Sequence, residues 1–236
     1  MKANRSVTLW AAAIVPAAVS IPLSGCDHAS KPANNGLDSA MAEKGGDNPV
    51  FVESVGPSGL SDKDGLDVLS TLPPFELTAE DGNSFGSEHL RGKVWIATFI
   101  FTRCSYTCPA QMAEFRRIQE QLSGHPARDD IHLVSITVDP KYDTPEVLQA
   151  YADKSSANPT RWKFLTGRRS DLWSLSKDGF KLSVFDSEEN SDALIAHSQK
   201  FVLVDRHGRI RGYYEGLEAA GREKLMQDLE ILLAND

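Results

Sequence analysis

Two cysteines with three residues between them carry the clearest chemical signal in this chain. Cys104 and Cys108 follow an apolar run over residues 94–101, and Pro109 opens an amphipathic stretch. The run predicts a buried strand and the stretch a helix, which puts Cys108 at the N-cap and Cys104 in the loop before it. Unpaired N–H groups and the helix dipole there favour the thiolate form of both sulfurs. Such a pair can act as a redox couple or as soft metal ligands.

The amino terminus predicts where this chemistry takes place. Two basic residues precede an uncharged, mostly apolar stretch over residues 7–23, which Ser-Gly-Cys26 closes. This order is typical of a signal peptide, so residues 1–25 are interpreted as one. The sequence Leu23-Ser-Gly-Cys26 resembles the lipobox of bacterial lipoproteins, which implies that Cys26 becomes the lipidated first residue.

An uncleaved membrane anchor is the alternative to lipidation. Its clearly apolar part, residues 7–19, is shorter than the roughly 20 residues that span a bilayer, and a proline interrupts it. In both interpretations the body of the protein faces an extracytoplasmic space and is held at a membrane. Asp27 after the cysteine weakly favours the periplasmic face of the inner membrane.

Cysteine usage narrows the chemistry further. With Cys26 assigned to the lipid, Cys104 and Cys108 are the remaining thiols. In an oxidising compartment two such thiols form a local disulfide or hold a metal ion. A purely structural disulfide is the third interpretation, although closing so short a loop restrains the unfolded chain little.

Composition divides the remaining chain into a tether and a domain. Residues 26–69 are rich in Gly, Ser, Asn, Asp and Lys, which predicts a flexible tether. Residues 70–236 are long enough for one compact domain with its own core. The formal charge of -8 and the lack of a basic cluster argue against a nucleic-acid partner.

Strand-like and helix-like patterns alternate within that domain. Strands are expected over 75–78, 93–101, 131–138, 162–165, 200–204 and 210–214, and helices over 111–122, 145–153, 170–178 and 219–233. Asp143 or Thr144 is expected to cap the second of these helices. The pattern predicts an α/β fold of thioredoxin type, with a central mixed sheet flanked by helices.

Three motifs occur in order along this domain, and together they resemble one family. They are Phe101-Thr-Arg-Cys-Ser-Tyr-Thr-Cys-Pro109, Val138-Asp-Pro-Lys-Tyr-Asp-Thr-Pro145 and His197-Ser-Gln-Lys-Phe-Val-Leu-Val-Asp205. From about Pro74 onward the chain is similar to the Sco/SenC proteins. These are membrane-tethered, thioredoxin-like domains that bind copper and assist the assembly of cytochrome oxidase.

The resemblance implies a metal site and its ligands. It assigns Cys104, Cys108 and His197 as ligands of a copper ion, Cu(I) or Cu(II), which suits the chemistry because thiolates favour Cu(I) and imidazole accepts both oxidation states. It places Asp139 near the metal, where the carboxylate can orient a ligand, although Asp-Pro at a strand end is also a common turn. Ala196 stands where the family often has Asp. Met112, one helical turn after Cys108, is expected in the core rather than at the metal.

Two functions remain open at this stage. The first is a metallochaperone that delivers copper to the binuclear copper site of a membrane-bound cytochrome c oxidase. The second is a thiol–disulfide oxidoreductase that reduces the acceptor's cysteines, with Cys104 attacking and Cys108 resolving. The first makes the protein a carrier rather than an enzyme, with the oxidase's copper-acceptor subunit as partner. A second periplasmic copper chaperone or a thiol reductant would be a further partner.

Overall fold

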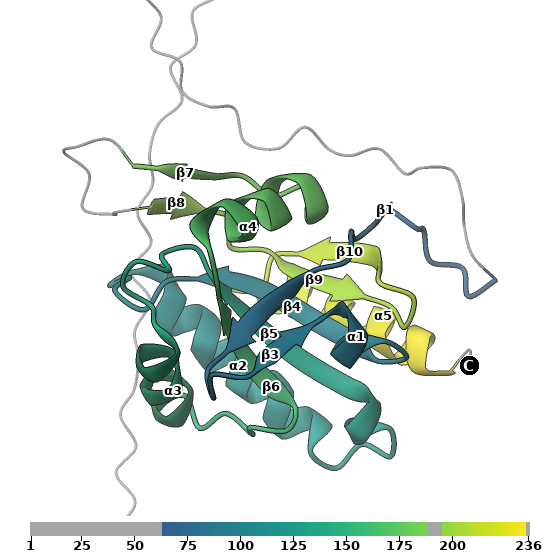
Figure 1. Ribbon diagram of the computed structural model, residues 1–236. Coiled ribbons are helices and arrows are strands. Elements are labelled where there is room, and N and C mark those ends of the chain that lie inside the picture. Colours follow the sequence, from purple (N-terminus) through teal and green to yellow (C-terminus); the bar gives the residue numbers. More distant parts are fainter. Residues whose placement is uncertain (1–62, 188–194, 235–236) are drawn as a thin grey trace, which may run out of the picture. The chain divides into compact units, whose positions relative to one another are not determined.

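The computed structural model describes residues 63–187 and 195–234 (Figure 1). The predicted signal peptide, the lipidation site at Cys26 and the tether up to residue 62 lie outside these residues. Within them the chain forms an eight-stranded sheet and a separate two-stranded hairpin. The strands of the large sheet follow the order β1 (Ser70–Thr71), β10 (Arg209–Tyr214), β9 (Phe201–Val204), β4 (Val94–Ile100), β5 (Ile131–Thr137), β6 (Trp162–Thr166), β2 (Glu76–Ala79) and β3 (Ser84–Gly86).

Strand pairing makes this sheet mixed, as the sequence predicted. The pairs β4–β5 and β5–β6 are parallel, whereas β9 pairs antiparallel with β4 and β2 pairs antiparallel with β6. In the parallel centre Ile100 at the end of β4 lies opposite Thr137 at the end of β5. The loops that follow these two strands therefore leave the same edge of the sheet, and they carry the first two motifs.

Helices cover both faces of the central strands. They are α1 (Ser87–Leu90), α2 (Thr107–Leu122), α3 (Pro145–Lys154), α4 (Arg169–Ser174) and α5 (Ala219–Ala234), with a π-helical turn over Leu175–Gly179 and a 3-10 turn over Arg128–Asp130. All seven residues of β4 are buried, which explains its continuous apolar run, because a strand covered on both faces has no solvent side.

Aromatic side chains show which helix packs on which face. Phe115 of α2 contacts Phe201 of β9 and Trp162 of β6 on one face. On the other face, Phe180 after the π-helical turn meets the edges of Trp95 and Phe99 of β4. The core therefore has a layer on each side of the sheet, which is the arrangement predicted for a thioredoxin-like fold.

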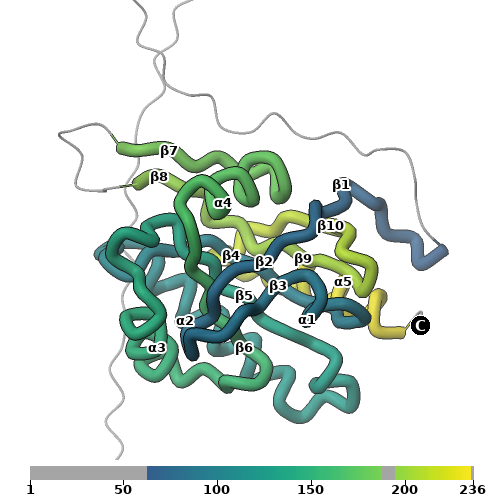
Figure 2. Tube along the Cα trace, in the orientation of Figure 1, coloured from purple at the N-terminus to yellow at the C-terminus, as the bar shows by residue number. Residues whose placement is uncertain are grey.

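The hairpin that bears His197 lies apart from the large sheet. Its strands β7 (Val184–Asp186) and β8 (Ile195–His197) pair antiparallel, with Val184 opposite His197. Figures 1 and 2 show the hairpin beside α4, above the sheet. Sequence patterns did not predict these three-residue strands, because so short a stretch shows no clear period.

Residues just before the expected domain start are held against the sheet. Arg211 of β10 is buried and donates hydrogen bonds to Asp64 and to the carbonyl oxygens of Leu66 and Asp67. The backbone N–H of Leu69 also donates to Ile210. The part of the predicted tether from residue 63 to residue 69 therefore packs on the domain. No helix of the described residues is both long and apolar enough to cross a membrane.

His132 on β5 gives the fold a predictable response to acid. Burial, followed by the nearby charges of Lys93 and Arg161, lowers the pKa of His132 to about 4, and its buried Nδ1 has no hydrogen-bond partner among the described residues. Between these two pKa values the unfolded chain, with a His pKa of about 6.5, therefore binds a proton at this residue and the folded chain does not. This contribution to stability is complete above pH 6.5 and is lost as the pH falls towards 4. Melting temperatures measured across this range should fall less in His132→Leu than in the wild type; an equal fall would contradict the assignment.

Candidate metal centre

The structure brings the three predicted ligands to one edge of the sheet. Cys104 lies in the loop after β4, Cys108 in the first turn of α2, and His197 at the end of β8. Nε2 of His197 lies 3.6 Å from Sγ of Cys108, across 89 positions of sequence. Both cysteines are free thiols.

Helix α2 begins earlier than predicted, and this changes the position of Cys108. The helix starts at Thr107 with Tyr106 as its N-cap, so Cys108 is its second residue and Pro109 its third. Proline is tolerated there because the first four N–H groups of a helix have no intrahelical acceptor. Cys108 consequently faces inward with Met112 and Phe115, at helical spacing, and its side chain is fully buried.

The two thiols differ in acidity, which corrects the expectation that both favour the thiolate. Burial is the largest influence on Cys104, but the N–H groups of Cys108, Tyr106 and Thr107, together with a hydrogen bond from the Cys108 side chain, outweigh it and lower the Cys104 pKa. The N–H of Cys108 lies 3.5 Å from Sγ of Cys104. For Cys108 burial dominates and raises its pKa, and the neighbouring Cys104 adds to the rise. Of the two cysteines, only Cys104 is therefore stabilised in its thiolate form by the start of the helix.

His197 is held with its lone pair towards sulfur. Its Nδ1 lies 2.9 Å from the carbonyl oxygen of Ser198, which can only accept, so Nδ1 carries the proton and Nε2 the lone pair. The ring also meets the edge of Phe101 in a T-shaped contact. Burial lowers the His197 pKa despite the Ser198 hydrogen bond, which favours the neutral, ligating form. Ser198 and Phe101 thus orient the ring, whereas the preceding residue, Ala196, has no polar side chain to do so.

The three side chains are near one another but not yet closed into a metal site. Among the described residues, no group of three His, Cys, Asp or Glu side chains is already arranged to hold an ion. Sγ of Cys104 instead faces the N–H groups at the start of α2. The Cys104 side chain also interacts with that of Cys108, and His197 lies against Cys108, so a three-ligand set requires these donors to converge on one position. The donor set, two sulfurs and one imidazole nitrogen, fits copper.

Asp139 contacts the neighbour of a cysteine. Its Oδ2 accepts a hydrogen bond of 2.6 Å from Arg103, which precedes Cys104, and no contact of Asp139 with the three candidate ligands is seen in the described residues. The guanidinium of Arg103 also lies 4.6 Å from the centre of the Tyr142 ring. Asp139 therefore acts on the cysteine loop through Arg103.

Asp143 is a site residue that sequence analysis considered only as a helix cap. Thr144 is the actual N-cap, whereas Asp143 is fully buried and accepts hydrogen bonds from Thr102 and from the hydroxyl of Thr137. It ties the end of β4 to the end of β5 beneath the cysteine loop, and burial raises its pKa. The sequence showed Asp143 as the second aspartate of the Asp-Pro-Lys-Tyr-Asp-Thr-Pro motif. Its hydrogen-bond partners, Thr102 and Thr137, are identified only by the structure, which places the ends of β4 and β5 side by side.

Two further side chains complete the description of the site. Met112 is buried, and its sulfur accepts a hydrogen bond from Ser135, which confirms the predicted core position. The hydroxyl of Thr107 lies 3.9 Å from Sγ of Cys104.

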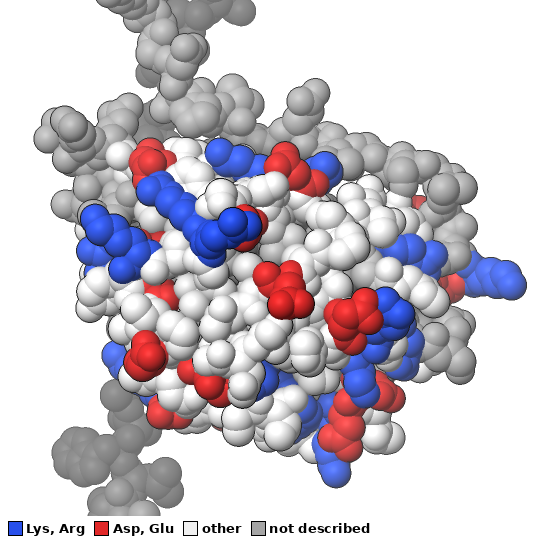
Figure 3. All heavy atoms as spheres, in the orientation of Figure 1, with Lys and Arg blue, Asp and Glu red and all other residues white. Residues whose placement is uncertain are grey.

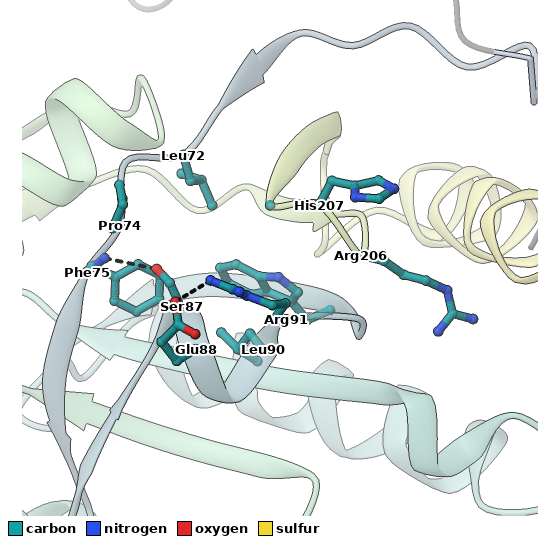
Figure 4. A pocket seen from close by; sticks show the side chains of 11 residues that line it. Leu72, Pro74, Phe75, Ser87, Glu88, Leu90, Arg91, Arg206 and His207 are labelled. Atoms are coloured by element: carbon teal, nitrogen blue, oxygen red, sulfur yellow. Dashed lines mark hydrogen bonds and ion pairs between the residues drawn. The ribbon is translucent and has the colours of Figure 1, made fainter.

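A different hollow lies at the far end of β4. About 420 Å³ in volume, it has Phe75, Leu90 and Trp95 among its lining residues, and Arg91 forms an ion pair with Glu88 at its rim (Figure 4). It contains one imidazole, that of His207, and no cysteine. Its chemistry does not suit a soft metal ion, so the candidate site remains the cysteine edge.

Comparisons with known proteins identify the family and the fold. The family model described as SCO1/SenC matches residues 64–234. The crystal structure of a SCO1/SenC family lipoprotein from Bacillus anthracis is 33% identical, with a TM-score of 0.64, and the match covers 70% of this chain and 95% of that one. The protein BsSco, described as having a disulfide switch and as a member of the Sco family of cytochrome c oxidase assembly proteins, is 29% identical over 71% and 95% of the two chains, with a TM-score of 0.61. Copper-bound yeast Sco1 is 26% identical over 68% and 89%, with a TM-score of 0.55.

Proposed function

The chain belongs to the SCO1/SenC family, and from this premise we propose that it is a copper metallochaperone. Cys104, Cys108 and His197 would hold one copper ion, which the protein delivers to the binuclear copper site of a membrane-bound cytochrome c oxidase. The proposal is supported by the copper-bound yeast relative and by the description of BsSco as an oxidase assembly protein.

The observation that carries this proposal is the facing pair of Cys108 and His197. The lone pair of Nε2 is directed at Sγ of Cys108 from 3.6 Å, and the opposite ring nitrogen is held by Ser198. A hydrogen bond to the second ring nitrogen is the usual way in which proteins fix a metal-ligating imidazole. A disulfide chemistry alone does not require an imidazole so oriented.

Exposure of the ligands suggests how the ion would leave. Cys108 is fully buried, whereas Cys104 is half-buried in the loop and held by N–H groups rather than by core packing. The acceptor's thiolate would therefore approach from the side of Cys104. A three-coordinate ion can accept this fourth ligand before Cys104 is released, so it need not pass through water as a free ion.

We expect the purified full-length chain, with its thiols reduced, to retain one copper ion per chain. Two sulfurs and one imidazole supply a set that binds soft copper ions tightly, and thiolate bonds to Cu(II) should add an intense charge-transfer absorption band. Copper content after dialysis against a moderate chelator measures the retention. Loss of the copper under these conditions would reject the chaperone and favour redox chemistry.

The amino-terminal interpretation leads to a proposal about location. We infer that lipid on Cys26 holds the domain at a membrane facing an extracytoplasmic space, which agrees with the description of the Bacillus anthracis relative as a lipoprotein. Cys26→Ala is expected to release the protein into the soluble fraction while its copper stoichiometry stays the same. Membrane retention of this variant with an unprocessed amino terminus would instead favour the uncleaved anchor.

A second candidate function, thiol–disulfide exchange, is favoured by the asymmetry of the two thiols. Cys104 is accessible and activated, and Cys108 is buried, which matches an attacking and a resolving thiol. Cys104 would attack a target disulfide and release one target thiolate. Cys108 would then attack Cys104, release the second thiolate and leave the protein with a disulfide, so that two electrons pass to the target. The disulfide switch described for BsSco supports this alternative.

A further inference from the structure

Large apolar side chains are exposed around the cysteine edge. Among the residues that the structure describes, the exposed large hydrophobic side chains are Tyr106 (62% exposed), Tyr142 (48%) and Phe185 (37%). Tyr106 lies between the two cysteines, Tyr142 follows β5, and Phe185 lies on β7 opposite Ala196, the neighbour of His197. Tyr142 contacts Arg103, the neighbour of Cys104, whereas the Phe185 side chain lies on the face of its hairpin opposite to His197. Exposed aromatic side chains near a site commonly mark a protein interface.

A shallow basic hollow adjoins these rings. It measures about 400 Å³ and has among its lining residues Arg103, Lys141 and Arg169, together with Asp139 and Asp186. Arg103 pairs with Asp139 and Arg169 pairs with Asp186, so these four charges compensate one another. Lys141 is exposed and forms no ion pair or hydrogen bond within the described residues. The hollow thus carries one uncompensated positive charge on a chain whose formal charge is -8.

In Figure 3, Lys and Arg side chains, with Asp and Glu side chains among them, lie over α4 and over the loops to its left. The connection between β7 and β8, residues 188–194, lies outside the described residues. We call the set of Tyr142, Phe185, Lys141 and Arg103 the aromatic–basic rim.

We propose that the aromatic–basic rim is the docking surface for the copper-accepting protein, whose matching surface presents apolar side chains and a carboxylate opposite Lys141. This rests on the proposed function. Ligand exchange requires the acceptor's thiolate to reach an ion held beside a buried Cys108. The acceptor must therefore contact the protein surface around Cys104. The side chains that it would cover are the exposed rings and the unpaired ammonium.

The two parts of the rim have different roles in association. Burial of Phe185 removes apolar area from water and supplies affinity that is insensitive to salt. Lys141, at the edge of the contact, attracts the acceptor's carboxylate and orients the encounter, and its influence is screened by salt.

The test measures binding of the full-length, copper-loaded chain to the soluble copper-acceptor domain of the organism's own oxidase, at low and high salt. We expect Lys141→Glu to weaken binding about fivefold at low salt and less at high salt. Phe185→Thr, which retains a strand-forming residue, should weaken binding about tenfold at both salt concentrations. Arg128→Glu is the matched control, because Arg128 is exposed at the opposite end of β5 and should leave binding unchanged.

Copper content and melting temperature of each variant are measured alongside, and both should equal those of the wild type. Unchanged affinity in both rim variants, an equal loss in Arg128→Glu, or no association of the wild type would overturn the proposal. So would self-association of the chain that Phe185→Thr abolishes, since the rim would then bind a second copy. Copper transfer by the wild-type chain is followed separately, and transfer that persists in any of these cases leaves the proposed function standing.

Discussion

Replacing His197 with Ala is expected to lower the affinity for Cu(II) by more than about a hundredfold, beyond the 10- to 100-fold typical of losing a residue that only orients a ligand. The variant loses the nitrogen ligand but keeps both thiols and the start of α2. Some two-coordinate Cu(I) should remain bound through the two sulfurs, because thiolates suit that ion. Competition with chelators of known affinity, for each oxidation state, measures both effects.

Two controls make this experiment decisive. His207→Ala removes an exposed imidazole in the turn between β9 and β10 and should leave copper affinity unchanged. A thermal melt must show that His197→Ala is folded, because the ring packs against Phe101. In a thiol–disulfide enzyme the first attack by Cys104 does not need His197, so an unaltered rate of mixed-disulfide formation with full oxidase assembly would refute the ligand role of His197.

Asp143→Ala is expected to destabilise the fold by about 3 kcal/mol. The substitution removes the acceptor of the Thr102 N–H and of the Thr102 and Thr137 hydroxyl groups, at a position that is fully buried. Buried donors left without a partner cost about 1–3 kcal/mol each, and rotation of the hydroxyl groups recovers part of this cost. For a domain of this size the loss corresponds to a fall in melting temperature of about 10 °C. Chemical denaturation of the reduced protein measures the free energy of unfolding.

The matched control is Asp129→Ala, which removes a carboxylate from the exposed 3-10 turn before β5 and should change stability little. The conservative variant Asp143→Asn keeps one acceptor oxygen and should lose less than Asp143→Ala. If Asp143→Ala were as stable as the wild type, the carboxylate would not be joining the ends of β4 and β5.

Much of the fold followed from local patterns. The strands observed as Val94–Ile100 and Ile131–Thr137 and the helix Pro145–Lys154 differ from their predicted bounds by at most one residue at each end. These elements are long, continuously apolar or clearly periodic, so their own residues specify them. The sequence did not predict the hairpin β7–β8, because its strands are too short to show an alternation of apolar and polar residues. Pairing between the two strands stabilises them instead.

The start of α2 shows how a small error in a boundary changes a chemical expectation. Placing Pro109 at the first helical position left Cys108 outside the helix and exposed to its dipole. With the helix beginning at Thr107, Cys108 shares the buried face of Met112 and Phe115. The helical spacing was visible in the sequence, but proline is compatible with several first-turn positions, so only packing selected one of them.

The sequence by itself determined which side chains could do chemistry, their order along the chain and, through three motifs, the family. The tertiary structure decided how those side chains differ. Burial raises the pKa of Cys108 while N–H groups lower that of Cys104, and the carbonyl of Ser198 directs the lone pair of His197 at sulfur. It also placed Asp143 between two strand ends. The physical reason is that a residue's type sets its possible bonds, whereas solvation and partners depend on segments far away along the chain.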